Sequence, residues 1–138
     1  MIRAILDTGP LVAVLDRSDA CHAWASEQLK LIQAPLITCE AVIAEVCFLL
    51  RRYPAATANI GNWIKGGIIE SRFILSPETE ATFALLKKFA DVPMSFADAC
   101  LVRLSGLYPE YRIFTLDQDF LIYRRNKRQR IPVLMPER

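Results

Sequence analysis

Short apolar runs alternate with longer helical segments along this chain, and this alternation constrains the fold more than any other feature. The predicted strands span residues 2–6, 35–38, 68–75, 111–115 and 131–134. The predicted helices span residues 11–15, 19–31, 41–52, 55–65, 76–90, 95 or 96 to 107, and 117–123, with Ser76 as the cap of the fifth. The sequence therefore predicts an α/β fold in which helices cover both faces of a mainly parallel sheet.

Length and composition favour one globular domain spanning residues 1–138. Apolar residues make up 53% of the 138, which is enough for a sizeable core. No apolar run reaches the roughly 18 residues that a membrane span requires. The opening MIRAILDTG lacks the apolar stretch and cleavage site of a signal peptide, so we expect a cytoplasmic protein without a membrane segment.

Histidine and cysteine chemistry is not favoured by the sequence. His22 is the only histidine, and its setting DACHAWA is typical of a helix start. Cys21, Cys39, Cys47 and Cys100 are scattered, and no two form a CxxC pair. We expect His22 to be structural or on the surface, and the cysteines to be neither disulfide-bonded nor zinc ligands.

The net charge of +2 conceals a basic segment at about 124–130. Without the five basic residues of this segment, 12 basic residues remain against 15 acidic ones, a balance of −3. The members are Arg124, Arg125, Lys127, Arg128 and Arg130. This split is compatible with a phosphate-contacting patch beside an acidic pocket, and equally with a solvated tail.

Two aspartates follow predicted strands. Asp7 ends the first strand, and Asp117 comes just after the strand 111–115. Since ligands of open α/β sheets bind beyond the carboxyl ends of the strands, both side chains are expected at one rim. Each could instead only cap the helix that follows, because aspartate is a favoured cap.

Glu45 is the only charge in the apolar stretch AVIAEVCFLL. Its neighbours at helical spacing include no basic residue; they are Ala41, Val42, Phe48 and Leu49. A buried carboxylate without a partner is strongly unfavourable, so such groups are paired, neutralised or bound to metal. We therefore expect Glu45 to belong to a metal site, unless it reaches solvent at the helix edge.

Asp98 lies among small and apolar residues in FADACLV. The preceding Ser95 could cap the helix while Asp98 reaches back to it, as in a capping box. The two interpretations are compatible, because an aspartate in the first helical turn faces the same rim as the strand ends. Four carboxylates gathered there would repel one another unless a cation compensates, and oxygen ligands without His or Cys favour Mg²⁺ or Mn²⁺.

These segments resemble the PIN-domain family, in particular the VapC-type toxins of bacterial and archaeal toxin–antitoxin pairs. The matching stretches are ILDTGPLVAVLD, AVIAEVCFLL, MSFADACLV and FTLDQDFLIYRR, in the family's order and across nearly the whole chain. The resemblance implies a three-layer sandwich with a parallel sheet of about five strands. It also implies metal-dependent endoribonuclease activity.

The resemblance assigns roles to individual residues. Asp7 and Asp98 match the principal metal ligands, Glu45 and Asp117 complete the catalytic cluster, and Asp119 is an additional ligand candidate. Thr8, Ser95 and Thr115 match polar positions that could orient carboxylates or bound water. Candidate contacts to the RNA backbone are Arg51, Arg52, Arg124, Arg125, Lys127 and Arg128.

The resemblance further implies an RNA substrate, a homodimer and a small inhibitory antitoxin. The region of Trp63 and the helix 41–50 could supply such protein surfaces, although core packing explains both equally well. One alternative from another class is a catalytically silent RNA-binding or regulatory module with the same fold. A phosphatase that uses Asp7 as nucleophile is disfavoured, because the second aspartate of that pattern is replaced by Gly9.

Overall fold

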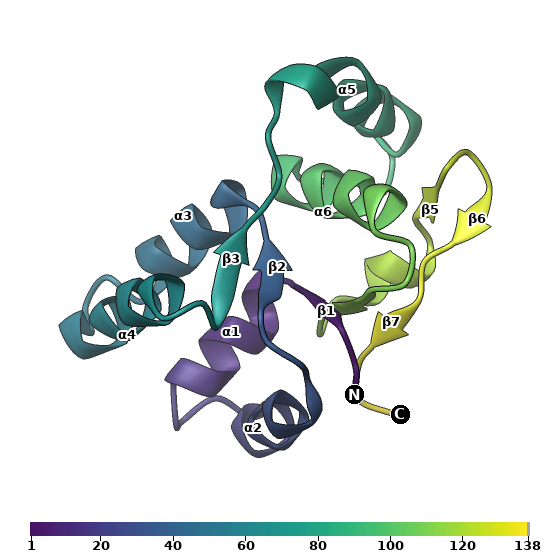
Figure 1. Cartoon of the computed structure of the whole chain (residues 1–138). Helices are drawn as coiled ribbons and strands as arrows, with labels where there is room; N and C mark the ends of the chain where they lie inside the picture. Colours follow the sequence, from purple (N-terminus) through teal and green to yellow (C-terminus); the bar gives the residue numbers. More distant parts are fainter. Residues whose placement is uncertain (138) are drawn as a thin grey trace.

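The computed structural model describes residues 1–137 and contains a five-stranded parallel sheet with helices on both sides (Figure 1). The sheet strands are β1 (Ala4–Leu6), β2 (Leu36–Thr38), β3 (Ile69–Ser71), β4 (Arg112–Phe114) and β7 (Val133–Leu134). Their order is β3-β2-β1-β4-β7, and every neighbouring pair is parallel. The α/β sandwich with a mainly parallel sheet of about five strands is thus confirmed.

Helical segments connect the strands. They are α1 (Thr8–Leu15), α2 (His22–Leu31), α3 (Glu40–Leu49), α4 (Pro54–Lys65), η1 (Ser76–Glu78), α5 (Thr79–Lys88), α6 (Phe96–Leu107) and η2 (Gln118–Leu121). All the helices predicted from the sequence are present, with ends shifted by a few residues. No helix within residues 1–137 is long and apolar enough to cross a membrane.

The two faces of the sheet bury different side chains, because side chains alternate along each strand. Leu6 and Phe114 are in register and lie on the face that α1, α2 and α4 cover; the ring of Trp24 packs 5.6 Å from that of Phe114. Ile5 and Ile113 point to the opposite face, against which α6 packs. Helix α5 lies on the outer side of α6 (Figure 1).

The basic C-terminal segment forms a hairpin that the sequence did not predict. Strand β5 (Arg124–Arg125) pairs antiparallel with β6 (Gln129–Arg130), beside α6. The turn places Asn126 and Lys127 in the left-handed region, with φ of 46° and 78°. This segment is therefore not a solvated tail.

One local prediction was wrong, and another was only partly confirmed. Ser76 does not cap a long helix, since residues 76–78 form the separate turn η1 and no side chain caps it. The strand predicted over 68–75 is only Ile69–Ser71, because β3 is an edge strand whose ladder ends with the three residues of β2. Beyond it, Ile74 is 71% exposed.

Candidate active site

The carboxylates singled out in the sequence line one pocket at the carboxyl edge of the sheet. Its volume is about 650 Å³, and its lining residues are Asp7, Thr8, Gly9, Glu45, Pro93, Ser95, Asp98, Leu116, Asp117, Gln118 and Asp119. Strands β1 and β4 are neighbours and parallel, which brings the residues after their ends to the same rim. We call this the acidic pocket.

Asp7 is the most deeply placed of these acids, with 6% of its surface exposed. One carboxylate oxygen accepts a hydrogen bond from the backbone N–H of Thr8, and the other accepts one from the hydroxyl of Thr115, both at 2.7 Å. The Thr115 oxygen in turn accepts from the backbone N–H of Asp117 at 2.9 Å. Two adjacent strand ends are thereby tied together through this carboxylate.

Burial raises the pKa of Asp7 from 3.8 to about 6. The hydrogen bonds from Thr115 and Thr8 oppose this shift, whereas the charges of Asp98 and Asp117 add to it. The pocket therefore disfavours an ionised Asp7 unless positive charge is brought in.

Asp98 lies in the first turn of α6, half-buried. Ser95 caps this helix, since its hydroxyl oxygen accepts from the backbone N–H of Asp98 at 3.0 Å. Among residues 1–137 no return bond to the Ser95 backbone completes a capping box; the Asp98 carboxylate instead accepts from the hydroxyl of Tyr123 at 2.8 Å. Helix capping thus explains the role of Ser95, but it leaves the Asp98 carboxylate facing the pocket.

Burial is also the main cause that raises the pKa of Asp98, with smaller contributions from the charges of Asp117 and Asp119. The pKa of Tyr123 is raised as well, by burial and by the adjacent Asp98, so its hydroxyl remains a donor. Tyr123 was missed in the sequence, because nothing in FLIYRR indicates which carboxylate 25 positions earlier its hydroxyl meets.

Asp117 and Asp119 come from the segment that follows β4. Asp117 is exposed and caps η2, as predicted, by accepting from the backbone N–H of Asp119 at 2.9 Å. Asp119 is half-buried, like Asp98. Both also line the pocket, so the capping role and a place among the acids coexist in Asp117.

Glu45 is not the buried, unpaired carboxylate that its apolar sequence neighbours predicted. Glu45 is exposed, and its neighbours Phe48 and Leu49 are 61% and 50% exposed. Helix α3 buries only Val42 and Val46, so the apolar sequence around Glu45 forms surface as well as core. Glu45 nevertheless lines the acidic pocket from the α3 side.

The chemistry of the lining suits a hard divalent cation. Within residues 1–137 no Lys, Arg or His lines this pocket, so no described side chain offsets the carboxylate charges. The hydroxyl of Thr8 is buried at the pocket without a partner among residues 1–137, which leaves it free to bind an oxygen of a ligand. In the part of the chain described, no three acids already lie close enough to surround one ion.

The basic residues proposed as RNA contacts lie outside the acidic pocket. Arg51 and Arg52 are exposed, and the guanidinium of Arg51 lies 4.1 Å from the ring of Phe48. Arg125 is only 4% exposed and donates to the Ser105 carbonyl, the Ser105 hydroxyl and the Pro109 carbonyl. Its guanidinium is therefore not free to bind the RNA backbone as predicted, because its donors hold the hairpin on α6.

The remaining sequence candidates take structural places. Nδ1 of His22 lies 2.7 Å from the Ala13 carbonyl oxygen, as expected for a structural histidine. The four cysteines are free, and Cys39 and Cys100 are buried in the core.

Fold and site together define an α/β domain whose ligand pocket is built from carboxylates at the ends of parallel strands. The chain belongs to the PIN domain family, whose match covers residues 4–126. This confirms the family resemblance predicted from the sequence.

Two individual proteins are similar to the chain. Ribonuclease VapC26 of Mycobacterium tuberculosis is 28% identical over 116 residues, which cover 83% of this chain and 86% of that protein. The crystal structure of Mycobacterium tuberculosis VapC20, described as a toxin that cleaves the sarcin–ricin loop, superposes with a TM-score of 0.75. That match has 18% identity and covers 84% of this chain and 91% of that one, so it supports the fold.

Proposed function

We propose that this protein is an endoribonuclease that depends on Mg²⁺ or Mn²⁺ and acts as the toxin of a type II toxin–antitoxin pair. The observation that carries the proposal is the acidic pocket, where five carboxylates meet the Thr8 hydroxyl. Among residues 1–137 this hydroxyl has no partner and no basic side chain lines the pocket. Membership of the PIN domain family and the similarity to ribonuclease VapC26 support it.

Asp7 and Asp98 are the residues we assign to the principal metal ion, because Asp7 is buried and because burial in the first turn of α6 raises the pKa of Asp98. A divalent cation at such a site activates water and stabilises the charge that develops on the phosphate. Thr115 and Tyr123 orient the two carboxylates through their hydroxyl groups. Glu45, Asp117 and Asp119 keep the mouth negative and can hold a second cation or the attacking water, while the Thr8 hydroxyl is free to contact a phosphate oxygen or water.

Cleavage of RNA with and without metal tests this proposal. Purified protein should cut RNA in Mg²⁺ or Mn²⁺ and stop in EDTA. Asp98→Asn should reduce the rate by orders of magnitude without unfolding the chain. Asp16→Asn is the matched control, because Asp16 caps the far end of α1 from Asp7 and lies outside the pocket. Full activity in Asp98→Asn would contradict the site assignment.

We also propose a homodimer and a small antitoxin partner. The α3 surface supports this part of the proposal, since Phe48 and Leu49 are large and exposed there. The other surface suggested by the sequence is less suitable, because Trp63 is half-buried against the core. Light scattering should give about twice the 15.6 kDa chain mass, and a monomer at all concentrations would contradict the dimer.

A further inference from the structure

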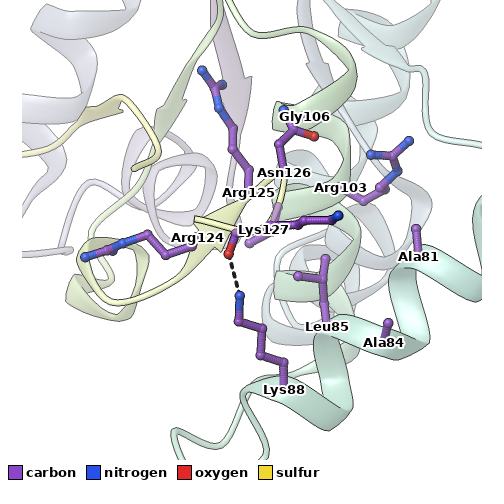
Figure 2. Close-up of a pocket in the computed structure, with 11 residues that line it drawn as sticks. Ala81, Ala84, Leu85, Lys88, Arg103, Gly106, Arg124, Arg125, Asn126 and Lys127 are labelled. Atoms are coloured by element: carbon purple, nitrogen blue, oxygen red, sulfur yellow. Dashed lines mark hydrogen bonds between the residues drawn. The ribbon is translucent and has the colours of Figure 1, made fainter. Parts of the chain in front are cut away.

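A second cavity, of about 420 Å³, lies between α5, α6 and the β5–β6 hairpin (Figure 2). Its walls are apolar and come from Ala81, Ala84 and Leu85 on α5 and Val102 on α6. At Gly106 the hairpin approaches α6 so closely that an added Cβ would lie 3.0 Å from the side-chain oxygen of Asn126. We call this the hairpin cavity; its size lies within the range of ligand sites.

The rim of the hairpin cavity is basic. Lys88, Arg103 and Lys127 all line it, and Figure 2 shows the Lys127 side chain extending from the hairpin toward Arg103. Arg103 pairs with Glu78, but within residues 1–137 no acid pairs with Lys88 or Lys127. Cations that converge over apolar walls favour an anionic ligand with an apolar part.

Lys127 occupies a backbone conformation that does not favour lysine. Its φ of 78° belongs to the region where glycine is the ordinary choice, and the Nζ of Lys88 donates to its carbonyl at 2.5 Å. A side chain kept in such a strained position points to a function. Here the ammonium that extends over the cavity gives the residue a use that glycine could not supply.

Helix α6 contributes residues to both the hairpin cavity and the acidic pocket. Asp98 lines one and Val102 the other, and residues four apart on a helix lie about 6 Å from each other. Tyr123, which binds Asp98, immediately precedes the hairpin strand β5. One strand of a polymer could therefore occupy both places at once.

We propose that the hairpin cavity is a nucleotide subsite for the RNA strand, an inference that rests on the proposed function. One unstacked base lies against the apolar walls of α5 and α6, and an adjoining phosphate meets Lys127 and Lys88. Single-stranded RNA supplies both groups, because its bases can be splayed out. An acidic peptide has the same charge, but RNA is favoured because one RNA strand could occupy both the hairpin cavity and the acidic pocket.

Binding of a fluorescent single-stranded RNA oligonucleotide in EDTA tests the base part of the proposal. Ala84→Trp fills the cavity and should weaken binding about tenfold, as expected for the loss of one base contact. Ala58→Trp, at an exposed position of α4, is the control and should bind like the wild type. An abasic oligonucleotide of the same length should be insensitive to Ala84→Trp.

The phosphate part is tested by the lysines. Lys127→Gly should lower the RNA affinity and reduce the salt dependence of log K by about 0.7, the value for one lost phosphate contact on a single strand. Its melting temperature should be equal or higher, since glycine adopts this φ without strain. Lys88→Ala should also weaken binding, whereas Lys87→Ala, one position along α5 and outside the cavity, should not.

Unchanged RNA binding in both Ala84→Trp and Lys127→Gly would overturn the subsite. The subsite would also be overturned if these two variants lose binding to an acidic apolar peptide while they still bind RNA. That result would assign the cavity to a protein partner. If these variants lose RNA binding but the wild type cleaves no RNA with metal, the subsite stands and the proposed function fails.

Discussion

The acidic pocket and the hairpin cavity lie about one helical turn apart on α6, yet they are built in opposite ways. In the pocket, the key carboxylates of Asp7 and Asp98 are sheltered and fixed by hydrogen bonds from Thr115 and Tyr123. In the cavity, the charges of Lys88 and Lys127 are on long exposed side chains above apolar walls. The comparison suggests that reacting atoms require preorganised ligands, whereas binding a strand requires charge that can adapt.

Asp7→Asn should have the largest effect, because it should abolish RNA cleavage and at the same time stabilise the metal-free fold. The pKa of the Asp7 carboxyl is about 6 in the folded protein and 3.8 in the unfolded chain. The stability that this carboxyl contributes to the fold is therefore complete below about pH 4 and is lost as pH rises through 6. In EDTA at pH 8 the variant should be more stable by up to about 3 kcal/mol, and the gap should close toward pH 4.

Urea unfolding of both proteins across this pH range measures that gap. An Asp7→Asn variant that is less stable than the wild type at every pH would contradict this prediction. It would show that the hydrogen bonds of the ionised Asp7 carboxylate outweigh the free-energy cost of burying its charge.

Tyr123→Phe should have an intermediate effect. Its ring packs against Phe89 and Phe120 at 5.3 and 5.2 Å, so the fold should persist while Asp98 loses its donor. Metal affinity should fall about 10- to 100-fold, as for other residues that orient ligands. In the wild type the hydrogen bond from Tyr123 lowers the pKa of Asp98, so its loss should raise that pKa. The acid limb of the pH–rate profile should therefore move to higher pH.

Tyr111→Phe is the control for this variant. Tyr111 is also buried and also loses a hydrogen bond, from Arg3 at 3.0 Å, but it lies at the other end of the sheet. Equal losses of metal affinity in the two variants would remove the special role of Tyr123.

Glu45→Gln should have a smaller effect than Asp7→Asn or Asp98→Asn. Because Glu45 is exposed, its charge is screened by solvent, and its loss should reduce the cleavage rate by less than about tenfold. A loss as large as that of Asp98→Asn, measured on the same RNA, would show that Glu45 binds the ion directly.

The sequence predicted the location of the site better than its energetics. Asp7 and Asp117 could be placed because strand ends in a parallel sheet share an edge. The exposure of Glu45 could not be predicted, because an apolar helix can leave some of its apolar side chains exposed. Phe48 and Leu49 are exposed in this way. The roles of Tyr123 and Arg125 depend on contacts across 25 and 20 positions, which local patterns do not encode.

Titration of the wild-type protein with Mn²⁺ by isothermal calorimetry tests whether the acidic pocket binds a divalent cation. We predict binding at or below millimolar metal, and its loss in both Asp7→Asn and Asp98→Asn. No binding by the wild type at millimolar Mn²⁺ would contradict a metal site in the acidic pocket and favour a catalytically silent RNA-binding or regulatory module.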